Sequence, residues 1–496
     1  MTSSEKRKIH SKSQEDIRKI NQELPYFIAI ITLMASSGIS PFMSLKKIIH
    51  LDLLQNMSKE AKRMIRQIEN LGMDPLTVMN KRASETLSNQ YSDFLSGYVS
   101  TVQSGGSVVH FLKSKMDSIF DVQGAIAKEL VVRLSALVDG YMIIQVVILT
   151  MYIIFIVISA TPSLAVSILP DPKSTTNLFY IFLMIPPLLS GSLMFIAHQM
   201  TTSTYIGTER ILKKNLLLTL IVVPIVIVVS LVLPQQHTWL PYFLAIALLT
   251  SSIISFSGYV KIEKMNSTAE RVTPSILRNI AESRRTGLSP ERCIIDAFKK
   301  GKNGVFSNTL DRAVNQMQWG MPLKTIIDHI RKDVSSWFVL INFRMLVEII
   351  ESGGGHAEAL DTLASSSEKM YNVEKMRRTM LSPYIVIAFL ITGITGFTTL
   401  LVIDSFTGLS QSVDFKEQIQ YATTETQSMR EMFAASIVFQ AHLVGLFIGK
   451  IVSGTFVTGL KYSIMLTTIV LLSIAVADFA PIDINMMFAP PNTSGI

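Results

Sequence analysis

Two stretches with the same spacing of Pro, Gly and Ser decide the fold of this 496-residue chain: PYFIAIITLMASSGISP, residues 25–41, and PSILRNIAESRRTGLSP, residues 274–290. Each has a Pro, twelve residues and then Gly-x-Ser-Pro, and the second begins 249 positions after the first. Pro favours the first turn of a helix, and Gly favours the position after its end. Ser-Pro then places a good N-cap before a good first helical residue. The pattern predicts a helix of about thirteen residues, a tight turn and a second helix, made twice.

The two copies continue to correspond beyond this hairpin. Gly72-Met73-Asp74-Pro75 in the first copy is matched by Gly320-Met321-Pro322 in the second, and Gly105-Gly106 is matched by Gly354-Gly355. Matched turns in one order indicate an internal repeat. Apolar residues at helical spacing lead us to expect two helical-bundle modules, residues 23–140 and 258–382, each able to bury its own core.

The module turns have two possible roles. They are either simple connectors between helices or contact points and hinges, and the sequence leaves both open. The residues concerned are Gly38, Pro41, Gly287, Pro290, Gly353, Gly354 and Gly355.

Composition points to a membrane protein. Hydrophobic residues make up 49% of the chain and charged residues 17%, a balance unlike that of a soluble protein of this length. Apolar runs of roughly 16 to 25 residues match the thickness of a hydrocarbon core. They lie at residues 142–159, 178–197, 216–233, 239–257, 384–403, 433–457 and 462–477.

We therefore expect an all-α polytopic membrane protein with about seven transmembrane helices. Its expected parts are a polar tail (1–22), the first module (23–140), four transmembrane helices (141–257), the second module (258–382), three transmembrane helices (383–480) with an extracellular loop or short amphipathic hairpin at 404–431, and a tail (481–496).

Lys and Arg are distributed unevenly about these crossings. Residues 1–21 contain six of them and no apolar core of the kind that a signal peptide needs, so we expect a cytoplasmic N-terminus. In that orientation only Lys173, Lys416 and Arg430 lie outside, which agrees with the positive-inside rule and places both modules in the cytoplasm. The formal charge of +8 follows these segments. It indicates contact with membrane lipid or an acidic protein partner rather than with nucleic acid.

The sequence offers little for catalysis. Cys293 is the single cysteine, which excludes an intramolecular disulfide and a cysteine-clustered metal site. The segment GLFIGK, residues 445–450, resembles a phosphate-binding loop, but it has one residue too few between its glycines and no preceding strand. Acidic residues at Asp328, Asp333, Glu348 and Glu351 have no visible third partner. We expect no enzymatic activity, catalytic residue, metal or cofactor.

The glycines near the last predicted crossings favour helix packing. Gly445 and Gly449 form a GxxxG pair, and Gly454 and Gly459 continue the small-residue character. The deepest ionisable groups there are His442 and Lys450. We expect Lys450 to extend to the lipid headgroups from a helix end. For His442 a polar contact and a proton relay both stay open.

The chain resembles the F-domain family of type II secretion and type IV pilus platform proteins. Residues 25–45, 274–297 and 346–364 carry the resemblance, and the spaced glycines of residues 445–462 are similar to the archaellum branch of that family. One departure lies at the second glycine turn. Family members commonly have Gly-Glu-x-Ser/Thr-Gly there, whereas this chain has ESGGG at residues 351–355, so no role is carried over to a single glutamate.

The resemblance implies a platform that does no covalent chemistry. It would be a homo-oligomer, a dimer, that takes work from a hexameric secretion or assembly ATPase and moves pilin- or archaellin-like subunits from the bilayer into a filament. Candidate contacts with the ATPase are the module cations Lys46, Lys47, Lys62, Arg63, Arg284, Arg285, Arg292, Lys299, Lys300 and Lys302. For any one of them, an ordinary solvated helix face is the simpler interpretation.

Two other classes fit parts of the pattern. A polytopic transporter would also combine repeats with ionisable groups near the membrane, but its repeats would lie in the crossings themselves. A membrane-anchored signalling scaffold is the third alternative.

Overall fold

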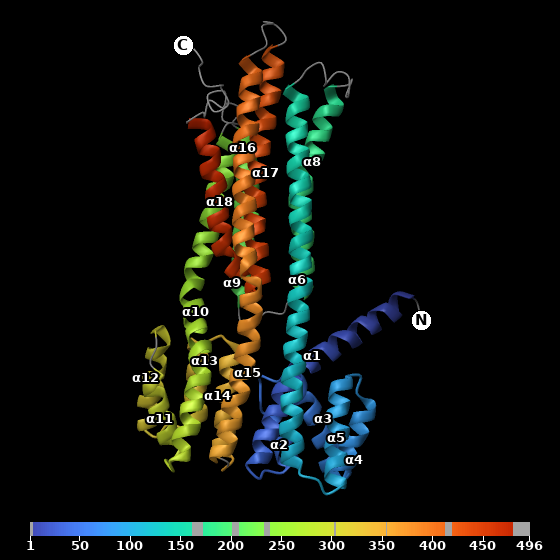
Figure 1. The fold of residues 1–496 in the computed structure, drawn as a ribbon, viewed down its shortest axis with the longest axis vertical. Helices are drawn as coiled ribbons and strands as arrows, with labels where there is room; N and C mark the ends of the chain where they lie inside the picture. The colour runs from blue at the N-terminus through green and yellow to red at the C-terminus, as the bar shows by residue number, and fades with distance from the viewer. Residues whose placement is uncertain are drawn as a thin grey trace, which may run out of the picture. The chain divides into compact units, whose positions relative to one another are not determined.

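The computed structural model describes residues 3–160, 172–200, 208–232, 239–301, 304–353, 355–411 and 419–479, which are helical apart from short turns (Figure 1). The all-α prediction is confirmed. Lys302, Gly354, residues 412–418 of the expected loop and the tail 481–496 lie outside the described residues. The chain divides into two compact units. Unit 1 is Met1–Lys128 with Lys261–Met376, and unit 2 is Glu129–Val260 with Arg377–Ile496.

Unit 1 contains both copies of the repeat, and their helices follow the same order. The first copy is built of α1 (Ser3–Ser36), α2 (Pro41–Ile48), α3 (Gln55–Leu71), α4 (Pro75–Glu85), α5 (Asn89–Gln103) and the start of α6 (Val108–Ala160). The second copy is built of the end of α10 (Leu240–Arg285), α11 (Pro290–Lys300), η2 (Gly304–Phe306), α12 (Ser307–Gln318), α13 (Leu323–Asp333), α14 (Trp337–Glu351) and most of α15 (Ala357–Leu381).

The two repeat prolines do not begin helices, contrary to expectation. Pro25 lies inside α1, and Pro274 lies inside α10. A proline in a helix interior removes one backbone hydrogen bond, but the residues before it continue the helix. In α10 the helix begins in a candidate membrane span, where an unbroken helix keeps the backbone groups paired. The helices that follow the turns start as predicted, α2 at Pro41 and α11 at Pro290.

The two modules expected as separate bundles share one hydrophobic core. Tyr26 of the first copy packs edge-on against Trp337 of the second, with ring centroids 4.2 Å apart. The indole Nε1 of Trp337 donates a hydrogen bond to the carbonyl oxygen of Leu53 at 3.2 Å. Lys369 pairs with Asp117 at 2.7 Å, which joins α15 to α6. The repeat thus folds as one unit in which each copy covers apolar surface of the other.

Unit 2 holds the long apolar helices. It consists of the remainder of α6, α10 and α15 together with α8 (Pro172–Met200), α9 (Thr208–Val232), α16 (Pro383–Gln411), α17 (Ile419–Ser453) and α18 (Phe456–Phe479). Within the span of α17, 72% of residues are buried, against 22–44% in the other spans. Helix α17 is therefore the central helix of the unit, packed by α8, α16 and α18.

Six helices in the described part of the chain are long and apolar enough to cross a membrane. They match six of the seven expected crossings, and the seventh, expected at residues 216–233, falls on α9, where much of that stretch lies outside the residues searched. Helices also extend into the segment expected at 404–431, since α16 continues to Gln411 and α17 begins at Ile419.

Candidate interaction surface

The first turn of each copy has the same construction. Gly38 and Gly287 have positive φ angles of 77° and 85°, a backbone conformation that Gly adopts at little cost. The side chains of Ser40 and Ser289 cap α2 and α11 by accepting hydrogen bonds from backbone N–H groups. The sequence decided these turns locally, because cap and proline act within a single turn of helix.

The third turn also repeats, with a shift of one residue from the expected match. Gly105 follows α5 with φ 71°, and its structural counterpart after α14 is Gly353 with φ 77°. The preceding cap residues are Ser104 and Ser352. Gly105 therefore corresponds to Gly353 rather than to Gly354.

Arg284 joins the first turn of the second copy to the third. Its Nε donates to the carbonyl oxygen of Gly355 at 2.5 Å, and its Nη1 donates to the carbonyl oxygen of Leu288 at 2.6 Å. The side chain is only partly exposed. Arg284 therefore links two turns of the fold. A docking role requires a free surface charge, which Arg284 is not.

The other basic residues near these turns are also engaged. Lys47 donates to the hydroxyl of Ser352, so α2 of the first copy meets the third turn of the second. Lys46 pairs with Glu69 at 2.6 Å, and Arg285 pairs with Asp361 at 3.1 Å across exposed side chains. Pairs of the exposed kind contribute little to stability and exchange readily for another partner.

Helix α11 presents three exposed cations of the candidate set. Its buried face consists of Cys293, Ile294, Ala297 and Phe298. Arg292, Lys299 and Lys300 of the same helix are exposed. Burial raises the pKa of the Cys293 thiol, so this cysteine stays protonated and serves packing.

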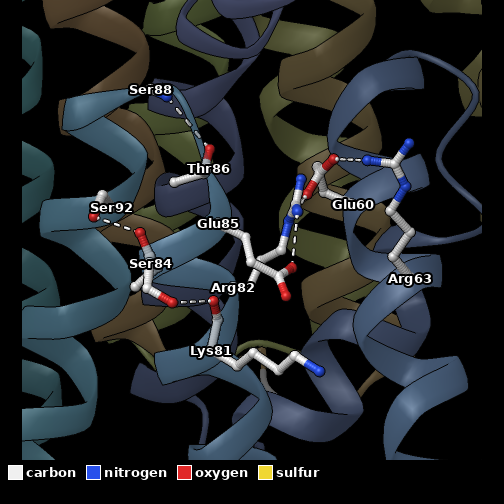
Figure 2. Close-up of polar contacts among 10 residues, drawn as sticks. Glu60, Arg63, Lys81, Arg82, Ser84, Glu85, Thr86, Ser88 and Ser92 are labelled. Carbon is white, nitrogen blue, oxygen red and sulfur yellow. Dashed lines mark hydrogen bonds and ion pairs between the residues drawn. The ribbon is translucent and has the colours of Figure 1, made fainter.

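Arg63 of α3 belongs to a polar network in the first copy (Figure 2). Glu60 accepts from Arg63 at 2.8 Å and from Arg82 at 2.6 Å, and its side chain is 5% exposed. Arg82 reaches Glu85 at 3.4 Å. Arg63 and Lys62 are both exposed, but Arg63 pairs with a buried carboxylate.

Two exposed apolar residues escaped the sequence analysis. Leu71 and Trp319 are 70% and 89% exposed, and each directly precedes a glycine of positive φ, Gly72 or Gly320. Trp is enriched at protein interfaces, whereas single exposed apolar residues are common on any protein surface. The repeat alignment was the signal that would have found them.

Close helix packing surrounds the glycines where α17 meets α18. A Cβ on Gly449 would collide with Gly459 Cα, and one on Gly445 would collide with backbone atoms of Ser463. Gly454, with φ 73°, lies in the turn between α17 and α18. The backbones of α17 and α18 therefore meet at these positions.

Two ionisable residues of α17, His442 and Lys450, also face protein. Lys450 is 2% exposed, and its Nζ donates to the carbonyl oxygen of Gly454 at 2.7 Å. Contrary to expectation, it closes the end of α17 instead of extending outward, because a buried carbonyl offers it a partner. His442 Nδ1 lies 2.6 Å from Ser463 Oγ, a polar contact between α17 and α18.

No group of three or more His, Cys, Asp or Glu suited to a metal ion occurs in the described ranges. Residues 445–450 are buried within α17, so their backbone N–H groups serve the helix and do not form a phosphate cradle.

A helical repeat made twice, carried with six helices able to cross a membrane, defines a polytopic α-helical membrane protein. The family model of type II secretion system protein F matches the chain at residues 27–156 and again at 276–403. The chain belongs to this family, and the repeat is its F domain, present twice. The uncharacterized protein MJ1286 of Methanocaldococcus jannaschii is 20% identical over 409 residues, which cover 76% of this chain and 67% of the relative. The chain matches no solved structure.

Proposed function

We propose that this protein is the membrane platform of an archaeal type IV pilus-like filament, an archaellum or a pilus, of the kind represented by the archaellum assembly protein FlaJ (ArlJ). It couples a cytoplasmic assembly ATPase to the insertion of pilin- or archaellin-like subunits and is not itself an enzyme. The observation that carries this proposal is the double match to the protein F family. An archaeal relative supports the archaeal assignment.

The shared core of unit 1 supports a mechanical role. Because both copies bury apolar surface against each other, a force applied to one copy displaces the other with it. In the proposed topology unit 1 and the N-terminus lie in the cytoplasm, the apolar helices of unit 2 contact lipid and filament subunits, and two copies of the chain form a dimer.

The docking surface we propose centres on the exposed face of α11 and on Arg285. Arg292, Lys299 and Lys300 suit an acidic patch on an ATPase, since exposed charges steer association and act most strongly at low salt. Arg284 is left out of this surface because its guanidinium serves the fold.

The test measures binding of the full chain in nanodiscs to the filament-type ATPase of the same organism. Replacing Arg292, Lys299 and Lys300 together by Glu should weaken binding at low salt by about tenfold or more, since juxtaposed like charges cost several kcal/mol. The matched control replaces the exposed first-copy cations Lys59, Arg66 and Lys81 by Glu. Equal binding by both triple variants would refute docking through α11.

Deleting the gene separates the platform from a transporter. The platform proposal expects cells without filaments and with normal solute uptake. Intact filaments together with lost uptake of a solute would instead support the transporter.

A further inference from the structure

A pocket of about 240 Å³ lies inside unit 1 where the two copies meet. The first copy contributes His50, Asp52 and Leu53 from the connection between α2 and α3. The second copy contributes residues of α13 and α14, among them Lys324 and Arg344. The hydrogen bond from Trp337 to the carbonyl oxygen of Leu53 fixes the connection against α14, so the pocket wall is rigid at the junction of the copies.

Arg344 is the decisive residue of this pocket. It is 9% exposed, and among the residues that the structure describes it pairs with Glu348, whose Oε1 lies 3.4 Å from its Nε. A guanidinium has five N–H donors, so the contact with Glu348 leaves most of them available to a ligand. Arg344 is one of the residues that line the pocket.

The other lining residues restrict the chemical class of ligand that the pocket can bind. Lys324 and Arg331 add two exposed cations of α13, and Arg331 is only loosely engaged, 4.0 Å from Asp52. Ile327 and Leu340 form a buried apolar wall. Asp52 and Asp328 can accept hydrogen bonds from hydroxyl or amino groups.

We propose that this pocket binds a small oxyanion, a carboxylate or phosphate group on a compact and partly apolar body, with Arg344 as the bidentate anchor. Planar guanidinium groups match both anions in geometry. Because the walls come from both copies, the bound anion would hold the copies together and stabilise unit 1. The proposal does not rest on the platform function, since it concerns ligand binding by the isolated chain.

The test is thermal unfolding of the full chain in detergent, at constant ionic strength, with sodium lactate, sodium phosphate or sodium chloride. Lactate or phosphate should raise the melting temperature saturably above the chloride series. Arg344→Lys keeps the positive charge but loses the planar pair of N–H donors. The salt concentration that gives half of the maximal shift should therefore rise by about tenfold or more. Arg292→Gln removes an exposed cation outside the pocket and should leave it unchanged.

The two salts distinguish a carboxylate site from a phosphate site, and saturation by either one supports the proposal. Lys324→Gln at the pocket rim should raise the half-maximal salt concentration by a smaller factor. This variant tests the proposal if Arg344→Lys does not fold. Equal shifts with all three salts would overturn the proposal. Full saturation retained in both Arg344→Lys and Lys324→Gln would overturn it as well.

Discussion

Arg284 Nε donates a hydrogen bond to the carbonyl oxygen of Gly355 at 2.5 Å, and the same guanidinium holds the carbonyl of Leu288. One side chain therefore spans two turns that are far apart in the sequence. In sequence it is indistinguishable from its neighbour Arg285, whose partner Asp361 is exposed.

This difference predicts unequal effects of the two arginines on stability. Arg284→Gln should lower the free energy of unfolding by about 1–3 kcal/mol, because two charge-assisted hydrogen bonds are lost. Arg285→Gln should cost less than about 1 kcal/mol, as expected of an exposed ion pair. Urea unfolding in detergent, followed by tryptophan fluorescence, measures both. Equal losses would show that Arg284 does not brace the turns.

Glycine is required where α17 and α18 meet. A Cβ at Gly449 would overlap Gly459 Cα, so Gly449→Ala should destabilise unit 2 by about 1–3 kcal/mol or more, the usual cost of overpacking. Gly393→Ala in α16 is the matched control because a Cβ there meets open space. The two melting temperatures in detergent give the comparison, and a variant of Gly449 as stable as that of Gly393 would contradict the close approach.

The Glu60 network should matter more than its surface neighbours. Glu60→Gln breaks two ion pairs of a buried carboxylate and should cost about 2–4 kcal/mol, since removing one partner leaves Arg82 poorly compensated. Glu85 is 45% exposed and pairs with Arg82 at 3.4 Å, so Glu85→Gln should cost less than about 1 kcal/mol. Urea unfolding separates them. Similar losses of unfolding free energy in the two variants would mean that the ion pair between Arg82 and Glu60 is not the main stabilising contact of Arg82.

Glu23 should make stability depend on pH. Its carboxylate accepts hydrogen bonds from the backbone N–H groups of Asn56 and Met57 at the start of α3. Burial nevertheless raises its pKa above the ordinary 4.5, against the opposing effect of these hydrogen bonds. The folded chain thus binds the proton more tightly than the unfolded chain, and the resulting stabilisation is present below pH 4.5 and lost as pH rises through the folded pKa.

Unfolding of wild type and Glu23→Gln across this pH range checks the sign. The stability of wild type relative to the variant should fall as pH rises. A constant difference would mean that the pKa of Glu23 is the same in folded and unfolded chains.

Much of the fold could be predicted because its signals are local. The helix starts at Pro41 and Pro290 depend on a cap and a proline within one turn. The length of each apolar run can be counted in the sequence and compared with the thickness of a membrane. Pro25 and Pro274 show the limit: the same local rule gave wrong helix starts, since residues upstream continue both helices.

The candidate surface was less predictable because the sequence shows which residues are charged but not which residues they pair with. Arg284 looks like a solvated cation in the sequence, yet in the fold its guanidinium donates to two backbone carbonyls. The sequence did not indicate that Trp319 is exposed or that Arg344 is buried, since exposure and burial depend on which helices pack together.

The sequence by itself determined a duplicated helical module, its turns and its apolar crossings, because the free energies of caps, glycine conformations and membrane burial depend on neighbouring residues and solvent. Only the tertiary structure decided that the two copies share one core, that Arg284 braces while α11 presents its cations, and that Arg344 lines a pocket between the copies. Those outcomes depend on contacts between residues far apart in the chain, whose energies no local pattern contains.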